Sequence, residues 1–375
     1  MRIAHISDTH LGLRQYNLDE RENDVYRAFE QAIDRVIEER VDVLIHSGDL
    51  FDSPTPPIKA LYVFKNTMKR LNGKVRIYTV LGDHDRPKRR GMPPHKLFDL
   101  RVLGVGGLEW EEVDGILIAG ISNLRGRMAE LLKEELKKFD QISEKYRKSI
   151  LIAHQAIDRF LPFEGDYELK EDDLPGSATY YAFGHIHSRQ TVKFGRGLFA
   201  YSGSIEITRR DEIPSWMKDG KGFYIVDLEG DEPSVEKVNL EIRPQLEVEL
   251  EDNRIGEILN QLNTRVEPIL HITVRGGKLD RAQIYEKLKE LLAGRVLEFR
   301  IRFEFEDVKK AFPELPRGQI SIEELIRRYL QDEELSKLAV ELFKSLSQED
   351  IDSAKNIAQS YLEAVLGDDS EKSQA

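Results

Sequence analysis

The stretch VLGDHDRPKRRG, Val80 to Gly91, decides how this chain is interpreted. A mostly apolar run ends at Leu81 and a glycine, and the side chains of Asp83, His84 and Asp85 follow at once. Carboxylate oxygen and imidazole nitrogen suit hard divalent cations, and the end of a buried strand holds such ligands rigidly. A run of positive charge comes next: Arg86, Lys88, Arg89 and Arg90. The stretch therefore predicts a metal site that acts on a polyanion.

Composition limits the remaining possibilities. At 375 residues the chain is longer than one core usually fills, so we expect one large domain with smaller ones. Because cysteine is absent, disulfides and thiolate ligands are excluded, and a metal must be held by His, Asp and Glu. The sequence shows no signal peptide and no apolar stretch that could span a bilayer, so we expect a cytoplasmic protein. The net charge of −12 argues against coating nucleic acid by charge alone, so any DNA contact is local or shared with a partner.

Asp or His follows the end of five predicted strands. Two predicted helices, residues 22–40 and 58–71, alternate with the first three strands, and this order predicts an α/β layered sheet whose strand ends share one edge. Any one of these residues could be an ordinary turn or cap residue, but the joint pattern is hard to produce by chance. The residues at the strand ends are Asp8, His10, Asp49, Asp83, His154, His185 and His187.

The ordered motifs DTH, GDLFD, GDHD, a single histidine after a strand, and GHIH resemble the calcineurin-like metallophosphoesterase superfamily. Within it, the segments SDTHLGLRQYNLDERENDVY, HSGDLFD and AFGHIH, with AYSGSIEI beyond, are similar to archaeal members of the SbcD/Mre-eleven family of double-strand-break repair nucleases. The match extends over most of residues 1–243. The fold class it implies is α/β: a layered metallophosphoesterase sheet core with helices on the faces, a small α/β capping domain and a C-terminal helical segment.

The resemblance implies a site for two metal ions, with manganese the family's preferred ion and magnesium possible. One ion would be held by Asp8, His10, Asp49 and His187. The other would be held by Asp49, Asp83, His154 and His185, so that Asp49 bridges both. His84 would lie beside the metals and protonate the leaving oxygen or neutralise developing charge, with Asp85 orienting its ring by a hydrogen bond.

Two positions depart from the family pattern. Asp83 stands where the family usually has Asn; it can supply the same oxygen but adds a negative charge, so we expect tighter metal retention and a slightly weaker grip on the phosphodiester. Asp52 stands where some relatives carry a further His, so a role for that His in steering the scissile phosphate cannot be transferred.

The basic residues near the metal motif are candidates for phosphate contacts, although such a run can also be a solvated loop. The candidates are Arg86, Lys88, Arg89 and Arg90, with Arg14, Tyr16, Arg209 and Arg210 weaker. The remaining histidines, His5, His46, His95 and His271, are interpreted as packed or unclustered side chains.

Composition shifts past Arg243. We expect the nuclease domain over residues 1–243, the capping domain over 244–306, a Pro-bearing linker over 307–319, a helical segment over 320–367 and a disordered tail over 368–375. Apolar residues line faces of the tail helices; they could fold back on the core, but by resemblance they bind a coiled-coil ABC-type ATPase of the SbcC/Rad-fifty kind. The residues chosen for this contact are Leu335, Leu338, Leu342, Leu346 and Tyr361.

The predicted helix 58–71 is apolar around much of its girth, which indicates either a homodimer contact or core packing. The resemblance implies an enzyme: a manganese-dependent DNA nuclease in break repair, acting as a 3′–5′ exonuclease on duplex DNA and as an endonuclease on single strands or hairpins. It would work with the ATPase and be nucleoid-associated when on DNA. The alternatives are a small-molecule metallophosphatase or phosphodiesterase, and a non-catalytic DNA-end scaffold.

Overall fold

The structure is a computed structural model that describes residues 1–71, 73–87, 91–98, 100–161, 167–252, 254–276, 280–304, 322–330, 332–347, 353–355 and 357–361. It divides into two compact units. The first unit comprises Met1–Asn123, Glu135–Gln155 and Pro175–Lys310. The second comprises Leu124–Glu134, Ala156–Leu174 and Ala311–Ala375.

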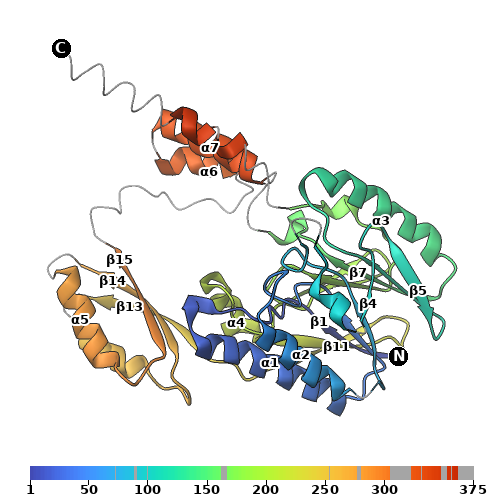
Figure 1. Ribbon diagram of the computed structural model, residues 1–375, viewed down its shortest axis with the longest axis horizontal. Helices are drawn as coiled ribbons and strands as arrows, with labels where there is room; N and C mark the ends of the chain where they lie inside the picture. The colour runs from blue at the N-terminus through green and yellow to red at the C-terminus, as the bar shows by residue number, and fades with distance from the viewer. Residues whose placement is uncertain are drawn as a thin grey trace. The chain divides into compact units, whose positions relative to one another are not determined.

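Two mixed β-sheets form the centre of the first unit (Figure 1). The first sheet runs in the order β12-β11-β1-β2-β3-β4, with bounds Ser234–Asn239, Gly222–Asp227, Arg2–Ile6, Val43–His46, Arg76–Thr79 and Arg101–Val102. The second runs β5-β6-β7-β8-β10-β9, with bounds Glu109–Val113, Ile116–Ile121, Lys148–His154, Tyr180–Gly184, Gly197–Tyr201 and Gln190–Phe194. Side chains from both sheets, including Val43 and Ile45 from one and Ile150 and Ile152 from the other, share one hydrophobic cluster.

The register of the parallel strands places their ends in line. In the first sheet Ile6 pairs with His46 and His46 with Thr79, and in the second sheet His154 pairs with Gly184. Strands β2 and β8 are buried along their whole length, which explains their nearly continuous apolar sequence. Within each sheet, the loops that leave these strands therefore begin side by side: those of β1, β2 and β3 in the first sheet, and those of β7 and β8 in the second.

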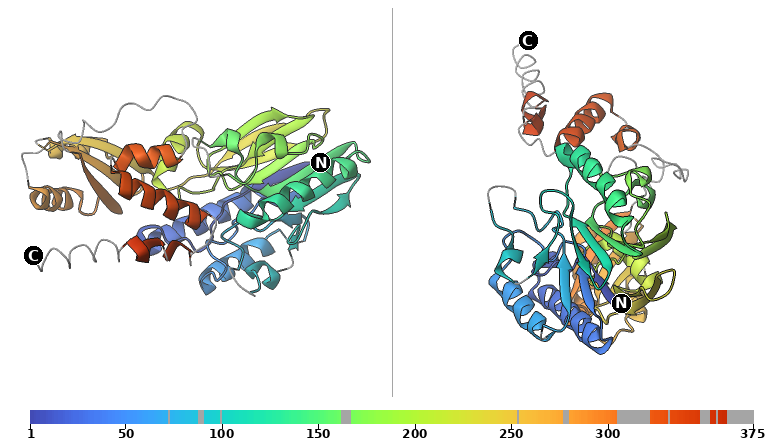
Figure 2. Two further views of the ribbon diagram at one scale, coloured as in Figure 1. Left: turned by 90° about the horizontal axis from the view of Figure 1, so that it is seen from above. Right: turned by 90° about the vertical axis from the view of Figure 1, so that its right-hand side faces the viewer.

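Helices α1 (Asp19–Glu38) and α2 (Ile58–Lys69) lie side by side in Figures 1 and 2 and cover the first sheet. Their buried residues, such as Phe29 and Phe64, pack with Leu44 of β2 in a second cluster. The opposite side of α2 leaves Ile58 84% and Tyr62 66% exposed. The other helices of the large domain are α3 (Ala129–Ser143) and the short α4 (Ile213–Asp219).

A smaller layer follows β12. Strands β13 (Gln245–Glu251), β14 (Ile269–Arg275) and β15 (Glu298–Glu304) are all parallel, and α5 (Arg281–Leu292) packs on them. Between β13 and β14 lies a 3₁₀ helix, η7 (Ile255–Gln261).

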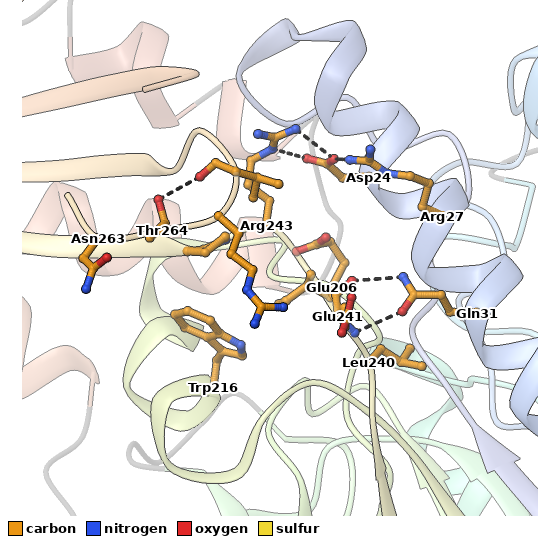
Figure 3. A pocket seen from close by; sticks show the side chains of 14 residues that line it. Asp24, Arg27, Gln31, Glu206, Trp216, Leu240, Glu241, Arg243, Asn263 and Thr264 are labelled. Carbon is orange, nitrogen blue, oxygen red and sulfur yellow. Dashed lines mark hydrogen bonds and ion pairs between the residues drawn. The ribbon is translucent and has the colours of Figure 1, made fainter. Parts of the chain in front are cut away.

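The small parallel sheet and the large domain meet around a cavity of about 590 Å³ (Figure 3). At its rim Arg243 donates to the buried Asp24 of α1 at 2.6 Å, and Gln31 of α1 exchanges hydrogen bonds with the backbone of Glu241. Trp216 of α4 forms another part of the wall. The connection between the two layers is thus held by polar side chains of α1.

The second unit contains α6 (Ile322–Leu330) and α7 (Glu333–Ser347), which contact each other and are joined by an ion pair of 2.6 Å between Lys344 and Glu323. Of the predicted partner-binding residues, Leu335 and Leu346 are exposed, whereas Leu338, Leu342 and Tyr361 are half-buried. The predicted linker 307–319 and tail 368–375 lie outside the described residues. In the part of the chain that the structure describes, no helix combines the length and the apolar character needed to cross a membrane.

Candidate metal centre

The predicted ligands leave the strand ends through strained turns. Asp8, His10 and Asp49 have positive φ values of 50°, 45° and 53°, and His185 has 91°. Residues other than glycine seldom adopt this left-handed conformation, and where they do the strain is often found at functional sites. The strain concentrated at these loops points to side chains held for a purpose.

Glycine precedes three of the ligands because nothing larger would fit. A Cβ on Gly82 would lie 2.0 Å from Asp49 Oδ1, and one on Gly48 would lie 2.4 Å from His154 Nδ1. A Cβ on Gly184 would lie 2.2 Å from the carbonyl oxygen of Ser47. The GD and GH pairs of the sequence are therefore packing requirements that bring the strand-end loops together.

Three ligands form the first donor set: Asp8, His10 and His187. His10 Nε2 lies 3.2 Å from His187 Nε2, and His187 Nε2 lies 3.7 Å from Asp8 Oδ1. One atom from each residue falls within a 4.8 Å group. Two imidazole nitrogens and a carboxylate oxygen thus converge on one point.

The second donor set consists of Asp83, His154 and His185. Asp83 Oδ1 lies 3.1 Å from His154 Nε2 and 3.2 Å from His185 Nδ1. Asp49 stands between the two sets, with its Oδ2 3.4 Å from His154 Nε2 and 3.7 Å from His10 Nε2. The structure therefore brings together all seven predicted ligands, with Asp49 in the central position.

The electrostatics of this cluster favour a cation. Burial opposes the charged form of His10, but the carboxylates of Asp52, Asp49 and Asp8 outweigh it and raise the pKa of His10 to about 9. Burial likewise opposes the ionised form of Asp49, yet His154 and His10 hold its pKa below the usual range. Protons on imidazole thus supply the positive charge that the carboxylates demand. Buried carboxylate and imidazole donors at these distances fit divalent cations.

His84 lies beside the donors and is 44% exposed, on a pocket of about 200 Å³. Its backbone N–H donates to Asp49 Oδ1 at 2.9 Å, and its Nδ1 donates to the carbonyl oxygen of Asp52 at 2.9 Å. Asp52 also places Oδ1 3.2 Å from His10 Nδ1. Asp52 thus contacts both a ligand and His84, a connection that we did not expect from the sequence.

Asp85 has different partners from those expected. Its buried carboxylate accepts the backbone N–H groups of Leu50, Phe51 and Gly82 at 3.2, 3.0 and 3.0 Å. It therefore joins the GDLFD loop to the GDHD loop, while the ring of His84 is oriented by Asp52. Neighbouring side chains in a tight turn point in different directions, which is why adjacency in the sequence was misleading here.

Other partners of the ligands come from distant segments. His187 Nδ1 donates to Glu212 Oε1 at 2.8 Å, and Asn123 Nδ2 donates to the carbonyl oxygen of His154 at 2.9 Å. Burial lowers the pKa of His187, so the ring is neutral and can bind a cation. Burial opposes ionisation of Glu212, but Lys221 and His187 hold its pKa well below the usual range. No local sequence motif marks either Glu212 or Asn123.

The predicted phosphate-contact residues are dispersed. Arg14 forms an exposed ion pair with Asp19. The guanidinium of Arg300 stacks over the ring of Tyr16, with its carbon 4.7 Å from the ring centroid. Arg86 donates to the carbonyl oxygen of Asn123. Arg209 lines the pocket at the donors. Lys88, Arg89 and Arg90 lie outside the described residues.

The other histidines are packed against protein groups. His5 is hydrogen-bonded to Tyr180 and Ser47, and burial lowers its pKa to about 3. His46 lies 3.1 Å from Thr9 Oγ1, and burial lowers its pKa to about 3 as well. Both remain neutral, as packed core residues do.

Comparisons with known proteins agree with this geometry. Residues 1–189 match the calcineurin-like phosphoesterase family model. A DNA double-strand break repair protein Mre11 from Thermoplasma acidophilum is 36% identical, with 98% of this chain and 99% of the relative covered. Proteins of the same name from Sulfurisphaera tokodaii and Methanocaldococcus jannaschii are 39% and 38% identical, covering 77% and 75% of this chain and 77% of each relative. This chain therefore belongs to the Mre11 family of calcineurin-like phosphoesterases.

Proposed function

We propose that this protein is a DNA nuclease of double-strand-break repair that hydrolyses phosphodiesters with two Mn²⁺ ions per chain, Mg²⁺ being a possible substitute. The observation that carries the proposal is the arrangement of two donor sets around Asp49, with the exposed ring of His84 beside them. The names of the similar proteins support DNA as the substrate.

The seven ligands divide the work of holding the ions. Asp8, His10 and His187 bind one ion, and the second donor set binds the other. Asp49 contributes to both, since two nearby cations need a shared anion to screen their repulsion. Cations bound here supply the positive charge that stabilises charge developing on the phosphate oxygens.

His84 supplies a proton. Its Nδ1 is held by the carbonyl oxygen of Asp52, and its Nε2 lies 4.0 Å from Asp83 Oδ2, at the edge of the pocket. Because Nδ1 donates to that carbonyl, Nε2 carries a proton only in the imidazolium form of the ring, and in that form it can donate to the leaving oxygen or neutralise the charge on it. Asp85 is a positioning residue, because its three backbone hydrogen bonds hold together the loops of Asp49 and Asp83.

DNA is held by groups around the pocket. Arg209 lines it, and the basic run from Arg86 to Arg90 begins one residue after Asp85. We propose Arg14 and Tyr16 as further contacts for DNA. The substrates are duplex ends, cleaved as a 3′–5′ exonuclease, and single strands or hairpins, cleaved as an endonuclease.

One assay separates a nuclease from the alternatives. Labelled duplex, hairpin and single-stranded DNA and a chromogenic phosphoester are each incubated with Mn²⁺, then with Mg²⁺, using wild type, His84→Ala and the exposed control Lys193→Ala. We expect wild type and the control to cleave DNA, and the cleavage rate of His84→Ala to be lower by roughly 10²–10⁴-fold. Turnover of the small ester alone would indicate a phosphatase, and no turnover with either substrate would indicate a scaffold.

A partner is proposed for the second unit. Leu335 and Leu346 expose apolar surface along α7, and with Leu338, Leu342 and Tyr361 they would bind the coiled-coil ABC-type ATPase. The proposed boundaries stay as predicted, with residues 320–367 as the ATPase-binding segment and 244–306 as the capping domain. In a pull-down with that ATPase, Leu335→Glu should weaken capture while the exposed Lys337→Glu on the same helix should not.

A homodimer is proposed through α2. Ile58 and Tyr62 are large apolar side chains exposed next to each other on one side of the helix. Sedimentation of wild type, Ile58→Glu and the control Lys193→Glu, an exposed residue of β9, tests the contact. Loss of dimer only in Ile58→Glu is expected, and a wild type that remains monomeric at micromolar concentration would contradict the proposal.

We propose that the protein acts in the cytoplasm at the nucleoid, where its substrate lies.

A further inference from the structure

Glu212 is a buried carboxylate at the end of η6 (Arg210–Glu212), next to the metal centre, and it belongs to none of its motifs. Its side chain is 3% exposed. Oε1 accepts from His187 Nδ1 at 2.8 Å and from the backbone N–H of Arg209 at 3.0 Å. A carboxylate buried this deeply needs compensation, and its contact with a metal ligand gives that compensation a functional meaning.

Lys221, directly before β11, provides the compensation. Its side chain is 2% exposed, and its ammonium group donates to the carboxylate of Glu212. It also donates to the carbonyl oxygen of His187 at 3.0 Å and to Ser204 Oγ at 2.6 Å. All three N–H bonds of the ammonium group are thus used, and one of them holds the backbone of the ligand itself.

The hydroxyl groups around Glu212 restrict it further. Thr208 Oγ1 lies 2.6 Å from Oε1 and 2.9 Å from His187 Nδ1, and Ser204 Oγ lies 3.1 Å from Oε2. With its lone pairs occupied on both oxygens, the carboxylate has one orientation. It therefore holds the ring of His187 in one orientation as well.

This orientation determines which nitrogen of His187 carries the proton. Because Nδ1 faces a carboxylate, which can only accept, Nδ1 must donate, and a neutral ring then has its lone pair on Nε2. His10 Nε2 lies 3.2 Å from this atom, as expected if His10 donates to it. Nε2 of His187 is therefore ready to bind a cation before the cation arrives.

His154, one of the two histidines of the second donor set, has another kind of partner. His154 Nδ1 donates to the carbonyl oxygen of Ser47 at 2.8 Å, a neutral acceptor. An anionic acceptor makes the metal-binding nitrogen more basic than a neutral one does. The Lys221 ammonium balances the charge of Glu212, so the basicity is gained without adding net negative charge to the protein around the site.

We propose that the Glu212–Lys221 pair positions His187, holding the ring with its proton on Nδ1 and thereby strengthening the binding of the ion in the first donor set. Glu212 and Lys221 are positioning residues, since neither touches the ion. The inference rests on the proposed two-metal function.

Metal titration of the full chain tests the proposal. Mn²⁺ is added to the metal-free protein in a calorimeter, using wild type, Glu212→Gln and the control Glu232→Gln, whose exposed carboxylate pairs with Lys193. We expect two ions per chain in wild type and control, and in Glu212→Gln a loss of roughly 10- to 100-fold for one ion with the other unchanged. Equal affinities for both ions in Glu212→Gln and wild type would overturn the proposal.

A double-mutant cycle shows whether Glu212 acts through His187. In a His187→Ala background, Glu212→Gln should cause no further loss of Mn²⁺ affinity, because the ring that it positions is gone. A full additional loss would show a general structural role and would overturn the proposal. If wild type itself binds fewer than two ions, the proposed two-metal function fails first, and this inference fails with it.

Nuclear magnetic resonance of the wild type gives a direct test of the tautomer, without a metal titration. With ¹⁵N-labelled histidine and His187→Ala to assign the signals, His187 in the metal-free protein should show a proton on Nδ1 and an unprotonated Nε2. The opposite tautomer would overturn the proposal. Glu212→Asp keeps the charge but shortens the side chain, so its His187 signals should move toward a mixture of tautomers.

Discussion

The two donor sets differ in what surrounds them. In the first set, His10 and His187 are each backed by a carboxylate, from Asp52 and Glu212. In the second set, Nδ1 of His154 donates to the backbone carbonyl of Ser47, and the backbone carbonyl of His154 accepts from the side-chain amide of Asn123. Both sets contain one carboxylate of their own and share Asp49.

This difference teaches that two sites with the same kinds of ligand need not bind alike. Anionic partners raise the basicity of the imidazoles in the first set, so we expect its ion to be held more tightly than the ion of the second set. The second set instead depends on Asp83, the residue that departs from the family pattern. Variants that affect one set or both can test this asymmetry.

The largest effect is expected from Asp49→Ala, because Asp49 belongs to both sets. We expect both ions to be lost together and DNA cleavage to fall by roughly 10²–10³-fold or more, since the ions carry the electrostatic stabilisation. Mn²⁺ titration and single-turnover cleavage measure these losses. If one ion were retained at wild-type affinity, the central position of Asp49 would have no functional meaning.

Asp52→Ala should affect mainly the first set. Removing the carboxylate beside His10 Nδ1 should lower the affinity for one ion by roughly 10- to 100-fold, while the backbone carbonyl that holds His84 remains. The second ion should bind as in wild type. For the ion of the first set, the affinity of Asp52→Asn should lie between those of wild type and Asp52→Ala. Equal weakening of both ions would contradict the asymmetry.

The sequence predicted the parts of this site that are local. An apolar strand followed by Asp or His is a short-range pattern, so the seven side chains that the structure brings together could be identified before their distances were known. The division of the strands between two sheets was not predicted, because an apolar run does not reveal which sheet its strand joins. The short helix α4 and the strand β9 were not predicted either.

The partners of the ligands were the harder part. Glu212 lies 25 residues from His187 and Asn123 lies 31 residues from His154, and no sequence motif links the members of either pair. The resemblance implied that Asp85 orients the ring of His84, but its carboxylate turns inward to the backbone of Leu50, Phe51 and Gly82. Contacts made after the chain folds back depend on tertiary packing, which periodicity does not encode.

The pH dependence of the metal-free protein should reveal the protonated imidazoles of both sets: burial opposes protonation of His154 too, but Asp49 and Asp83 raise its pKa well above the ordinary value. The pKa of His10 is about 9 in the folded chain, above the ordinary 6.5, so the protonated ring stabilises the fold fully below about pH 6.5. This stabilisation is lost as the pH rises through about 9, which amounts to about 2 kcal/mol between pH 7 and 9, or several degrees in Tm.

Thermal unfolding at these pH values, with chelator and with Mn²⁺, measures the effect. Bound metal takes the place of the proton, so the loaded protein should show little of the loss. His10→Gln should reduce the loss in the metal-free protein, with His154 responsible for what remains. A metal-free Tm that rises from pH 7 to 9 would show that His10 is not protonated in the way its carboxylate neighbours require.

The smallest effect is expected from Asp83→Asn, which restores the residue usual in the family. The amide oxygen can still face His154 and His185, so the ion of the second set should remain, with affinity lower by roughly tenfold for the lost charge. The ion of the first set should be unaffected. Because the variant leaves more positive charge facing the phosphodiester, KM for DNA should fall slightly as metal affinity falls. Mn²⁺ titration with cleavage kinetics at saturating metal measures both, and complete loss of the second ion would mean that the Asp83 charge, rather than its oxygen, is what the second set requires.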